Sequence, residues 1–101
     1  MARTISRGSF VWDAEKEKYN IQTHQLDFLS ASHAFFDPLR IIAVDEAHSE
    51  EEPRFFCVGK VQGKIATVRF TYRSDQIRII GAGFWRKGRK LYEETNKKNE
   101  E

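Results

Sequence analysis

The side chains of this 101-residue sequence best suited to chemistry are histidines and arginines. Histidine has the unperturbed pKa nearest neutrality, so His24 and His48 are our candidates for proton transfer. Arginine is planar, permanently charged and bidentate, which suits Arg54, Arg69 and Arg78 to stabilising an anionic group. Each of these residues, taken alone, is more often an ordinary surface side chain.

Other reactive residue types favour structural roles. His33 has apolar neighbours and reads as a packed helix histidine, while Cys57 lies between Phe56 and Val58 and reads as core. A single cysteine cannot form an internal disulfide, so we expect a cytoplasmic protein. Residues 45–53 include Asp, Glu and His, but no second His or Cys stands at zinc spacing. We therefore expect a solvated acidic loop, no metal and no cofactor.

Charge is unevenly distributed along the chain. The totals are nearly balanced, with 17 Lys plus Arg against 15 Asp plus Glu. Residues 69–92 nevertheless carry seven cations and one acid, and four of the cations are Arg86, Lys87, Arg89 and Lys90. An ordinary amphipathic helix explains their spacing, but not their shared sign, because helices usually mix signs to gain i,i+4 pairs. A C-terminal half of the chain with this excess of positive charge would attract a polyanion.

The elements that position these residues can be outlined from caps, breakers and periodicity. Asp13 and Asp27 are good N-caps for two helices, and Asp37-Pro38 ends the second. Phe10 and Trp12 read as a short strand or an ordered lead-in. Four strands then follow, at about residues 39–44, 54–61, 65–72 and 76–82, before a C-terminal helix. The apolar stripe of this helix is formed by Phe84, Gly88, Leu91 and Thr95, with Trp85 and Tyr92 beside it. We expect Phe84, Leu91 and Tyr92 to dock the helix on the sheet. No apolar run approaches the roughly 18–20 residues that span a bilayer.

The turn at residues 74–75 predicts the register of the last hairpin. Its apolar pairs are Tyr72 with Ile77 and Phe70 with Ile79. Its outer pairs are Thr71 with Arg78 and Arg69 with Ile80. A slip of one residue would mix arginine with phenylalanine on one face. Arg69 and Arg78 therefore become neighbours on the outer face, where a bound anion would offset their repulsion, unless both are simply solvated or paired with the acidic loop.

The order and spacing of several residues resemble a known family. The first group is Phe10, Trp12, Asp13, Lys16, Asn20 and His24, followed by Phe28, Ala31, Phe36 and Asp37-Pro38. The second is His48, Ser49, Glu52, Arg54, Phe55 and Gly59, followed by Val68, Thr71, Arg73, Arg78, Ile80, Ala82 and Tyr92. Over about residues 9–94 the sequence resembles the BrnT family of bacterial toxins.

This resemblance implies a fold and an activity. The fold would be RelE-like and α+β, with a small four-stranded twisted antiparallel sheet, two N-terminal helices and one C-terminal helix. One domain would span residues 1–101, with an ordered core at about 9–94 and a polar tail. The activity would be metal-independent cleavage of RNA. The partner would be a BrnA-type ribbon-helix-helix antitoxin, through which the complex binds operator DNA and represses its own operon. Toxin and antitoxin could assemble into a higher-order complex.

RNA cleavage without a metal uses the substrate's 2′-hydroxyl as nucleophile and needs a base, an acid and cations around the phosphorane-like transition state. The catalytic candidates are His24, His48, Glu52, Arg54 and Arg78, with Glu52 as base or as an orienting residue. The RNA-binding candidates are Lys16, Arg69, Arg86 and Arg89.

One segment departs from the family pattern. Many members have Ile-Ser-Ala-Arg after the last strand, but here Gly81 and Gly83 stand at the Ser and Arg positions. Either the helix cations replace the missing arginine, or activity is altered or lost. Two function classes therefore remain open: an endoribonuclease toxin, and a non-catalytic RNA- or protein-binding module that acts in a repressor complex.

Overall fold

A six-stranded mixed sheet forms the centre of the molecule, in the order β1-β2-β6-β5-β4-β3. The computed structural model describes residues 3–99. The strands are β1 (Thr4–Arg7), β2 (Phe10–Asp13), β3 (Ile41–Val44), β4 (Phe55–Val61), β5 (Lys64–Arg73) and β6 (Gln76–Gly83). The α-helices are α1 (Ala14–His24), α2 (Phe28–Ala31) and α3 (Arg86–Asn99), and two 3-10 turns are η1 (Ser32–Phe36) and η2 (Glu46–His48).

The expected four-stranded antiparallel sheet with two N-terminal helices was wrong, although the short strand considered at Phe10 and Trp12 is present as β2. The N-terminal hairpin of β1 and β2 precedes α1 and adds two strands. Strand β2 runs parallel to β6, with Val11 opposite Arg78. Strand β1 is mostly exposed and polar, and three residues of β2 are all buried, so neither shows the alternation that marks a half-buried strand.

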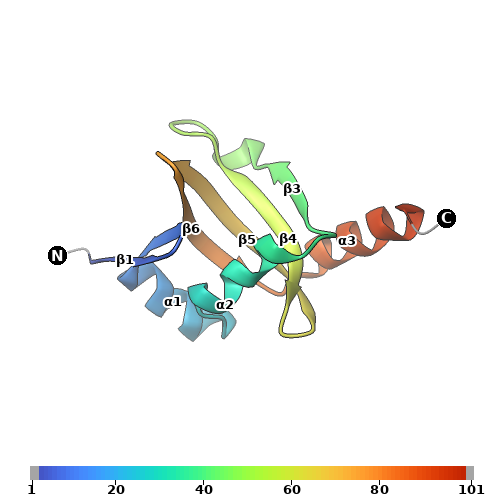
Figure 1. The fold of residues 1–101 in the computed structure, drawn as a ribbon, viewed down its shortest axis with the longest axis horizontal. Helices are drawn as coiled ribbons and strands as arrows, with labels where there is room; N and C mark the ends of the chain where they lie inside the picture. The colour runs from blue at the N-terminus through green and yellow to red at the C-terminus, as the bar shows by residue number, and fades with distance from the viewer. Residues whose placement is uncertain (1–2, 100–101) are drawn as a thin grey trace.

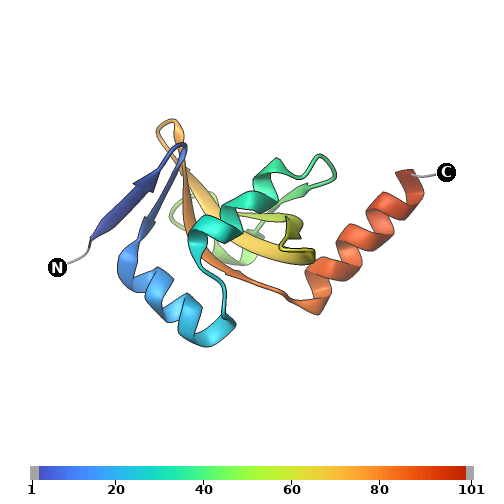
Figure 2. The ribbon, with the colours of Figure 1, turned by 60° about the horizontal axis from the view of Figure 1, so that its bottom comes forward.

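The helices lie on both sides of the sheet and at its ends (Figures 1 and 2). The segment α2–η1 packs on one face, where the core includes Cys57, Val68, Phe70 and Ile79. It approaches very closely at Gly59, where an added Cβ would lie 2.5 Å from the Ala34 carbonyl oxygen. Helix α3 contacts the opposite face of β4 and β5, and it extends away from the body at the end opposite the N-terminal hairpin.

The predicted register of the β5–β6 hairpin is correct near its turn and wrong beyond it. Tyr72 pairs with Ile77 and Phe70 with Ile79, as the sequence indicated. A bulge between Arg69 and Phe70 then shifts the pairing, so that Arg69 lies opposite Gly81 rather than Ile80. A bulge inserts one unpaired residue and re-aims the side chains beyond it.

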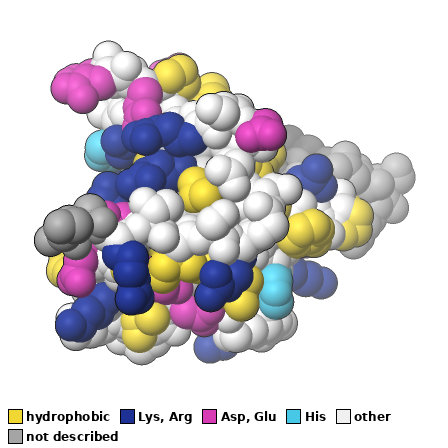
Figure 3. Space-filling model, turned by 60° about the vertical axis from the view of Figure 1, so that its left-hand side comes forward, with side chains coloured by type: hydrophobic (Ala, Val, Ile, Leu, Met, Phe, Trp, Pro, Cys, Tyr) yellow, Lys and Arg dark blue, Asp and Glu magenta, His cyan; other side chains and the backbone are white. Residues whose placement is uncertain are grey.

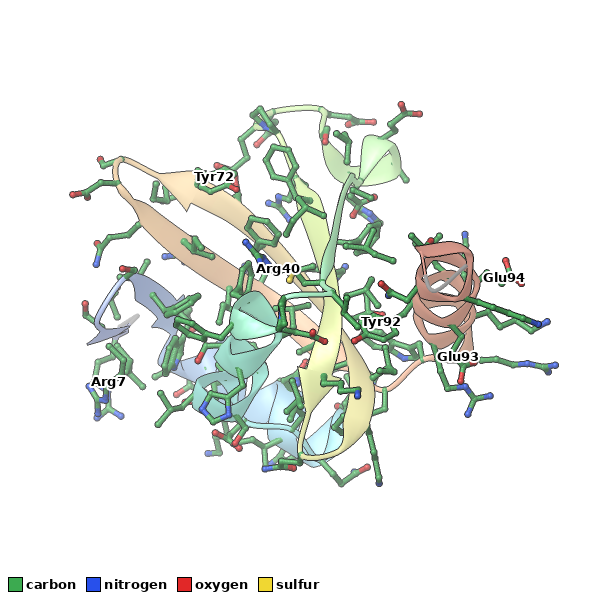
Figure 4. The ribbon with its side chains drawn as sticks, turned by 45° about the vertical axis from the view of Figure 1, so that its right-hand side comes forward. Arg7, Arg40, Tyr72, Tyr92, Glu93 and Glu94 are labelled. Carbon is green, nitrogen blue, oxygen red and sulfur yellow. The ribbon has the colours of Figure 1, made fainter. Side chains whose placement is uncertain are left out.

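Helix α3 packs through a narrower face than the predicted stripe. Gly88, Tyr92 and Asn96 are buried at i, i+4 and i+8, whereas Leu91 is 42% exposed. Gly88 allows close approach, since an added Cβ would collide with the Thr67 hydroxyl. Tyr92 points toward the body of the molecule while Glu94 points away from it (Figure 4). The Tyr92 hydroxyl donates a hydrogen bond to Asp37 Oδ2 at 2.7 Å. The expectation that Phe84, Leu91 and Tyr92 dock the helix on the sheet is therefore correct for Tyr92 and wrong for Phe84 and Leu91, which remain substantially exposed.

Candidate functional site

A groove of about 830 Å³ lies on the outer face of the sheet, between α1 and Trp85 at the start of α3. It brings together four residues that the sequence had nominated from three separate segments: Lys16, His24, Arg54 and Arg69. Glu15, Tyr19, Asn20, Phe56, Ile80, Gly81 and Trp85 complete the lining. We call this the basic groove. Lys and Arg side chains also gather on the side of the molecule that carries the N-terminal hairpin (Figure 3).

Arg69 enters the basic groove because of the bulge and of Gly81. The shifted register sets Arg69 opposite Gly81, and an added Cβ on Gly81 would lie 3.0 Å from Arg69 Nη2. The missing side chain thus leaves the space along which the guanidinium lies. Among the residues that the structure describes, Arg69 has no ion-pair partner, so its charge is available to a ligand.

Arg54 precedes β4, and one of its guanidinium nitrogens has no hydrogen-bond partner among the described residues. Its Nη2 lies 3.4 Å from Glu52 Oε1, and Glu52 also approaches Arg73 Nε at 3.5 Å. Its Nε is buried and has no hydrogen-bond partner in the part of the chain that the structure describes. A buried donor without a partner is costly.

His24 is held at the end of α1. Asp13 caps the start of this helix by accepting from the backbone N–H groups of Glu15 at 2.8 Å and Lys16 at 3.0 Å. The Lys16 bond is the main reason that the pKa of Asp13 is lowered, so the cap stays ionised. At the other end, the His24 imidazole meets the Trp85 indole edge to face, with ring centroids 5.0 Å apart.

Asn20 fixes α1 against the sheet. Its side-chain amide donates to the carbonyl oxygens of Leu26 and Ala82, both at 2.9 Å, and its Oδ1 accepts from the Ala82 N–H at 3.1 Å. The residue is buried, so these bonds are shielded from water. Asn20 therefore sets the distance between α1 and β6, and with it the width of the basic groove.

Comparison with known families now decides the classification. The model of the family described as "Ribonuclease toxin, BrnT, of type II toxin-antitoxin system" matches residues 12–88. This chain belongs to the BrnT family. The match includes His24, Arg54 and Arg69, and it confirms the resemblance seen in the sequence. A search of curated proteins found no match.

Membership of the BrnT family makes the chain a ribonuclease toxin of a type II toxin-antitoxin system. It implies an RNA substrate and an antitoxin protein as partner. No helix in the described part of the chain is long and apolar enough to cross a membrane. Within residues 3–99, no group of three or more His, Cys, Asp or Glu is arranged to hold a metal ion.

His48 and Glu52 lie beside the basic groove rather than in it. Both line a smaller cavity of about 260 Å³ in the acidic loop, which shares Arg54 with the groove. His48 Nδ1 contacts Asp45 Oδ2 at 2.9 Å, and Asp45 is buried, so this pair anchors the loop. Glu52 reaches the groove only through Arg54.

The remaining nominated cations are spread around the basic groove. Arg78 lies on β6 opposite Thr71, and its charge helps to lower the pKa of Asp13. Arg86 and Arg89 line a second cavity of about 550 Å³, which also includes Lys64 and Phe84. Neither of these two arginines lines the basic groove.

The sequence had placed Trp85 only beside an apolar stripe, yet it borders the basic groove, the second cavity and an apolar cleft of about 350 Å³. The apolar cleft is lined by Ala43, Phe56, Val58, Thr67, Trp85, Lys87, Gly88 and Leu91. The signal in the sequence was an aromatic pair between two glycines and four cations, Gly81 to Lys90.

Gly83, one of the two departures from the family pattern, makes room for this tryptophan. An added Cβ on Gly83 would lie 2.6 Å from Trp85 Cζ2, so the indole occupies the space that a larger residue there would need. Both glycines thus accommodate a side chain of the basic groove, Arg69 over Gly81 and Trp85 over Gly83.

Proposed function

We propose that this protein is a metal-independent endoribonuclease toxin that cuts RNA through the substrate's own 2′-hydroxyl in the basic groove. The observation that carries the proposal is the convergence of His24, Arg54 and Arg69 in one groove. A histidine for proton transfer and two arginines for phosphate match what this reaction needs.

In the proposed reaction the 2′-oxygen attacks the adjacent phosphorus and the bond from phosphorus to the 5′-oxygen breaks. His24 accepts the proton of the 2′-hydroxyl, and the leaving 5′-oxygen takes up a proton from solvent water. The protonated His24 then returns its proton to solvent, so that no net proton is gained or lost. The products are a 2′,3′-cyclic phosphate, or the 3′-phosphate formed by its hydrolysis, and a 5′-hydroxyl end. Arg54 and Arg69 stabilise the negative charge that builds on the phosphate oxygens in the transition state.

Glu52 serves in this scheme to orient Arg54. The carboxylate lies between Arg54 at 3.4 Å and Arg73 at 3.5 Å, so it fixes one side of the Arg54 guanidinium. Arg78, Lys16, Arg86 and Arg89 bind RNA phosphates outside the reacting centre. His48 supports the loop that carries Glu52 through its bond to Asp45.

The proposed partner is a BrnA-type antitoxin with a ribbon-helix-helix part, which would bind operator DNA. A segment with acidic residues would cover the basic groove and the cations of α3, and so exclude RNA. The apolar cleft beside α3 would receive apolar side chains of the same segment. Lys87 lines this cleft and Arg86, Arg89 and Lys90 are exposed nearby, so a segment held by these cations would also reach the cleft. An antitoxin bound entirely on the acidic loop would contradict this arrangement.

Expression without a partner tests the function in cells, where a cytoplasmic toxin of this kind acts. We expect growth arrest and degradation of RNA after induction. Intact total RNA in cells that contain folded, soluble protein would count against the enzyme and would favour a non-catalytic binding module, as the departures at Gly81 and Gly83 allow.

A further inference from the structure

Trp85 lies where the basic groove meets the second cavity. It follows the end of β6 and precedes the first residue of α3. The groove holds Arg69 and Lys16, and the second cavity holds Arg86 and Arg89. A strand of RNA that follows these cations from one hollow to the other must therefore pass the indole.

The Trp85 indole is both exposed and held in place. Trp85 is 36% exposed as a residue, whereas the other tryptophan, Trp12, is 2% exposed. Gly83 provides the space in which the indole lies, and His24 contacts it edge to face. A fixed aromatic ring that is partly open to solvent is a surface on which a planar ligand can stack.

The second cavity has the composition of a surface for single-stranded nucleic acid. Phe84 is 36% exposed, and Lys64 Nζ lies 5.4 Å from the centre of its ring. Arg86 has no ion-pair partner in the part of the chain that the structure describes, and Arg89 has only a long contact of 4.0 Å with Glu93. Aromatic rings between cations bind single strands because each base can stack while its phosphate meets a charge.

We propose that Trp85 is the stacking site for a nucleobase next to the cleaved bond, and that the strand continues into the second cavity, where Arg86 and Arg89 hold its phosphates. The inference rests on the proposed function for RNA as the substrate, and it specifies that the substrate is single-stranded. A base in a duplex is already stacked between its neighbours and is not free to stack on a side chain. Stacking also tolerates any base, so Trp85 selects for strandedness rather than sequence.

Binding of an uncleavable oligonucleotide tests the stacking directly. A single strand with 2′-O-methyl groups has no free 2′-hydroxyl, so it binds without being cut. Because Trp12 is buried, quenching of the intrinsic fluorescence during titration reports mainly on Trp85. We expect quenching that saturates with single strand and is much weaker with the matching duplex.

Substitution of the indole provides the second arm. Trp85→Leu should bind the oligonucleotide roughly 5- to 150-fold more weakly, the loss expected for one stacked base. Trp85→Phe should recover most of the affinity. Gly83→Ala should weaken binding in the wild-type background by displacing the indole, and should add little in the Trp85→Leu background. Phe36→Leu is the matched control, since Phe36 is an aromatic residue 72% exposed that lines neither hollow.

Salt dependence tests the path into the second cavity. Replacing Arg86 or Arg89 separately with Ala should reduce the slope of log affinity against log salt by about 0.7, the value for one phosphate contact to a single strand. Lys18→Ala, at an exposed position of α1 outside both hollows, should leave the slope unchanged.

The outcomes separate this inference from the proposed function. If folded Trp85→Leu and Gly83→Ala bind as tightly as the wild type, and wild-type quenching is absent, Trp85 only packs α3 and the inference is wrong, even if RNA is still cut. If the wild type neither binds the strand nor cuts RNA, the proposed function fails as well. If Trp85→Leu does not fold, the wild-type quenching and the affinities of Trp85→Phe and Gly83→Ala still decide whether a base stacks on Trp85.

Discussion

The imidazole of His24 and the indole of Trp85 meet edge to face, with ring centroids 5.0 Å apart and planes at 78°. The contact joins the last residue of α1 to the residue that precedes α3, across one end of the basic groove. It restricts the imidazole while leaving it in the lining of the groove. A group that transfers a proton in the transition state must be positioned in this way.

His24→Gln should lower kcat/KM for RNA cleavage by roughly 100- to 10,000-fold, the usual contribution of a positioned acid or base. Its affinity for a 2′-O-methyl oligonucleotide and its melting temperature should change little. The matched control is His33→Gln. His33 is exposed on η1, so the expectation of a packed histidine was wrong, and it lines neither the groove nor the second cavity. Wild-type cleavage by His24→Gln would remove this residue from the reaction.

Arg54→Ala and Arg69→Ala should each lower kcat by roughly 100- to 1,000-fold, because each removes donors aimed at the charge of the transition state. Arg69→Lys should recover only part of the rate, since an ammonium cannot bind the phosphate in a bidentate manner. Arg7→Ala removes the same charge from β1, outside the groove, and should cut normally. If Arg7→Ala and Arg69→Ala lower the rate equally, only net charge matters. If both cut at the wild-type rate, Arg69 has no part in the reaction.

Leu91→Glu separates the antitoxin surface from the RNA surface. Leu91 lines the apolar cleft and is 42% exposed, so the substitution leaves the core intact. We expect the affinity for the antitoxin to fall roughly tenfold or more, as for a central interface residue, with RNA cleavage unchanged. Leu29→Glu is the control, because Leu29 is exposed on α2 away from the cleft. Unchanged antitoxin affinity for Leu91→Glu would place the partner elsewhere.

The bond between Tyr92 and Asp37 predicts how stability depends on pH. Burial and the bond to Asp37 raise the pKa of Tyr92 from 10.0 to about 12. Burial alone would raise the pKa of Asp37, but hydrogen bonds from Tyr92, Leu39 and Lys60 together lower it from 3.8. The stabilisation from Tyr92 is therefore complete below pH 10 and is lost between pH 10 and about 12, whereas that from Asp37 is lost as the pH falls below 3.8.

Tyr92→Phe should thus unfold more easily than the wild type at pH 7, by roughly 1–3 kcal/mol for a bond to a carboxylate. Urea unfolding at pH 7, 10 and 11.5 measures the difference in unfolding free energy between the two proteins. This difference should become smaller from pH 7 to pH 10 and smaller again at pH 11.5, because only the wild type has a Tyr92 hydroxyl whose stabilisation can be lost. A difference that stays constant to pH 11.5 would mean that the hydroxyl contributes nothing through Asp37.

Local signals in the sequence were sufficient for the elements near the site. The caps at Asp13 and Asp27 begin α1 and α2 as predicted, and the turn at 74–75 sets the pairing of Tyr72 with Ile77. These signals depend on residues close in the chain, so one sequence contains them.

Non-local pairing was beyond such signals. The parallel contact between β2 and β6 joins residues more than sixty positions apart, and the bulge that sets Arg69 opposite Gly81 depends on how β5 and β6 pair. A glycine inside a strand often accompanies a bulge, but Gly81 alone does not fix the shift in pairing. The sequence nominated His24 and Arg54 by residue type and family pattern, and Arg69 by residue type and its place on the outer face of the last hairpin. It could not show that they share a groove, that His48 lies outside it, or that Trp85 borders it.

The most direct test of the central claim is the chemistry of the cut ends. Purified protein should cleave single-stranded RNA in excess chelator and leave 2′,3′-cyclic phosphate or 3′-phosphate ends with 5′-hydroxyl ends. An RNA with a single 2′-deoxy nucleotide at the cut position should resist cleavage there. Cleavage that stops with chelator and returns with a divalent ion, or folded protein that leaves RNA intact, would contradict the account.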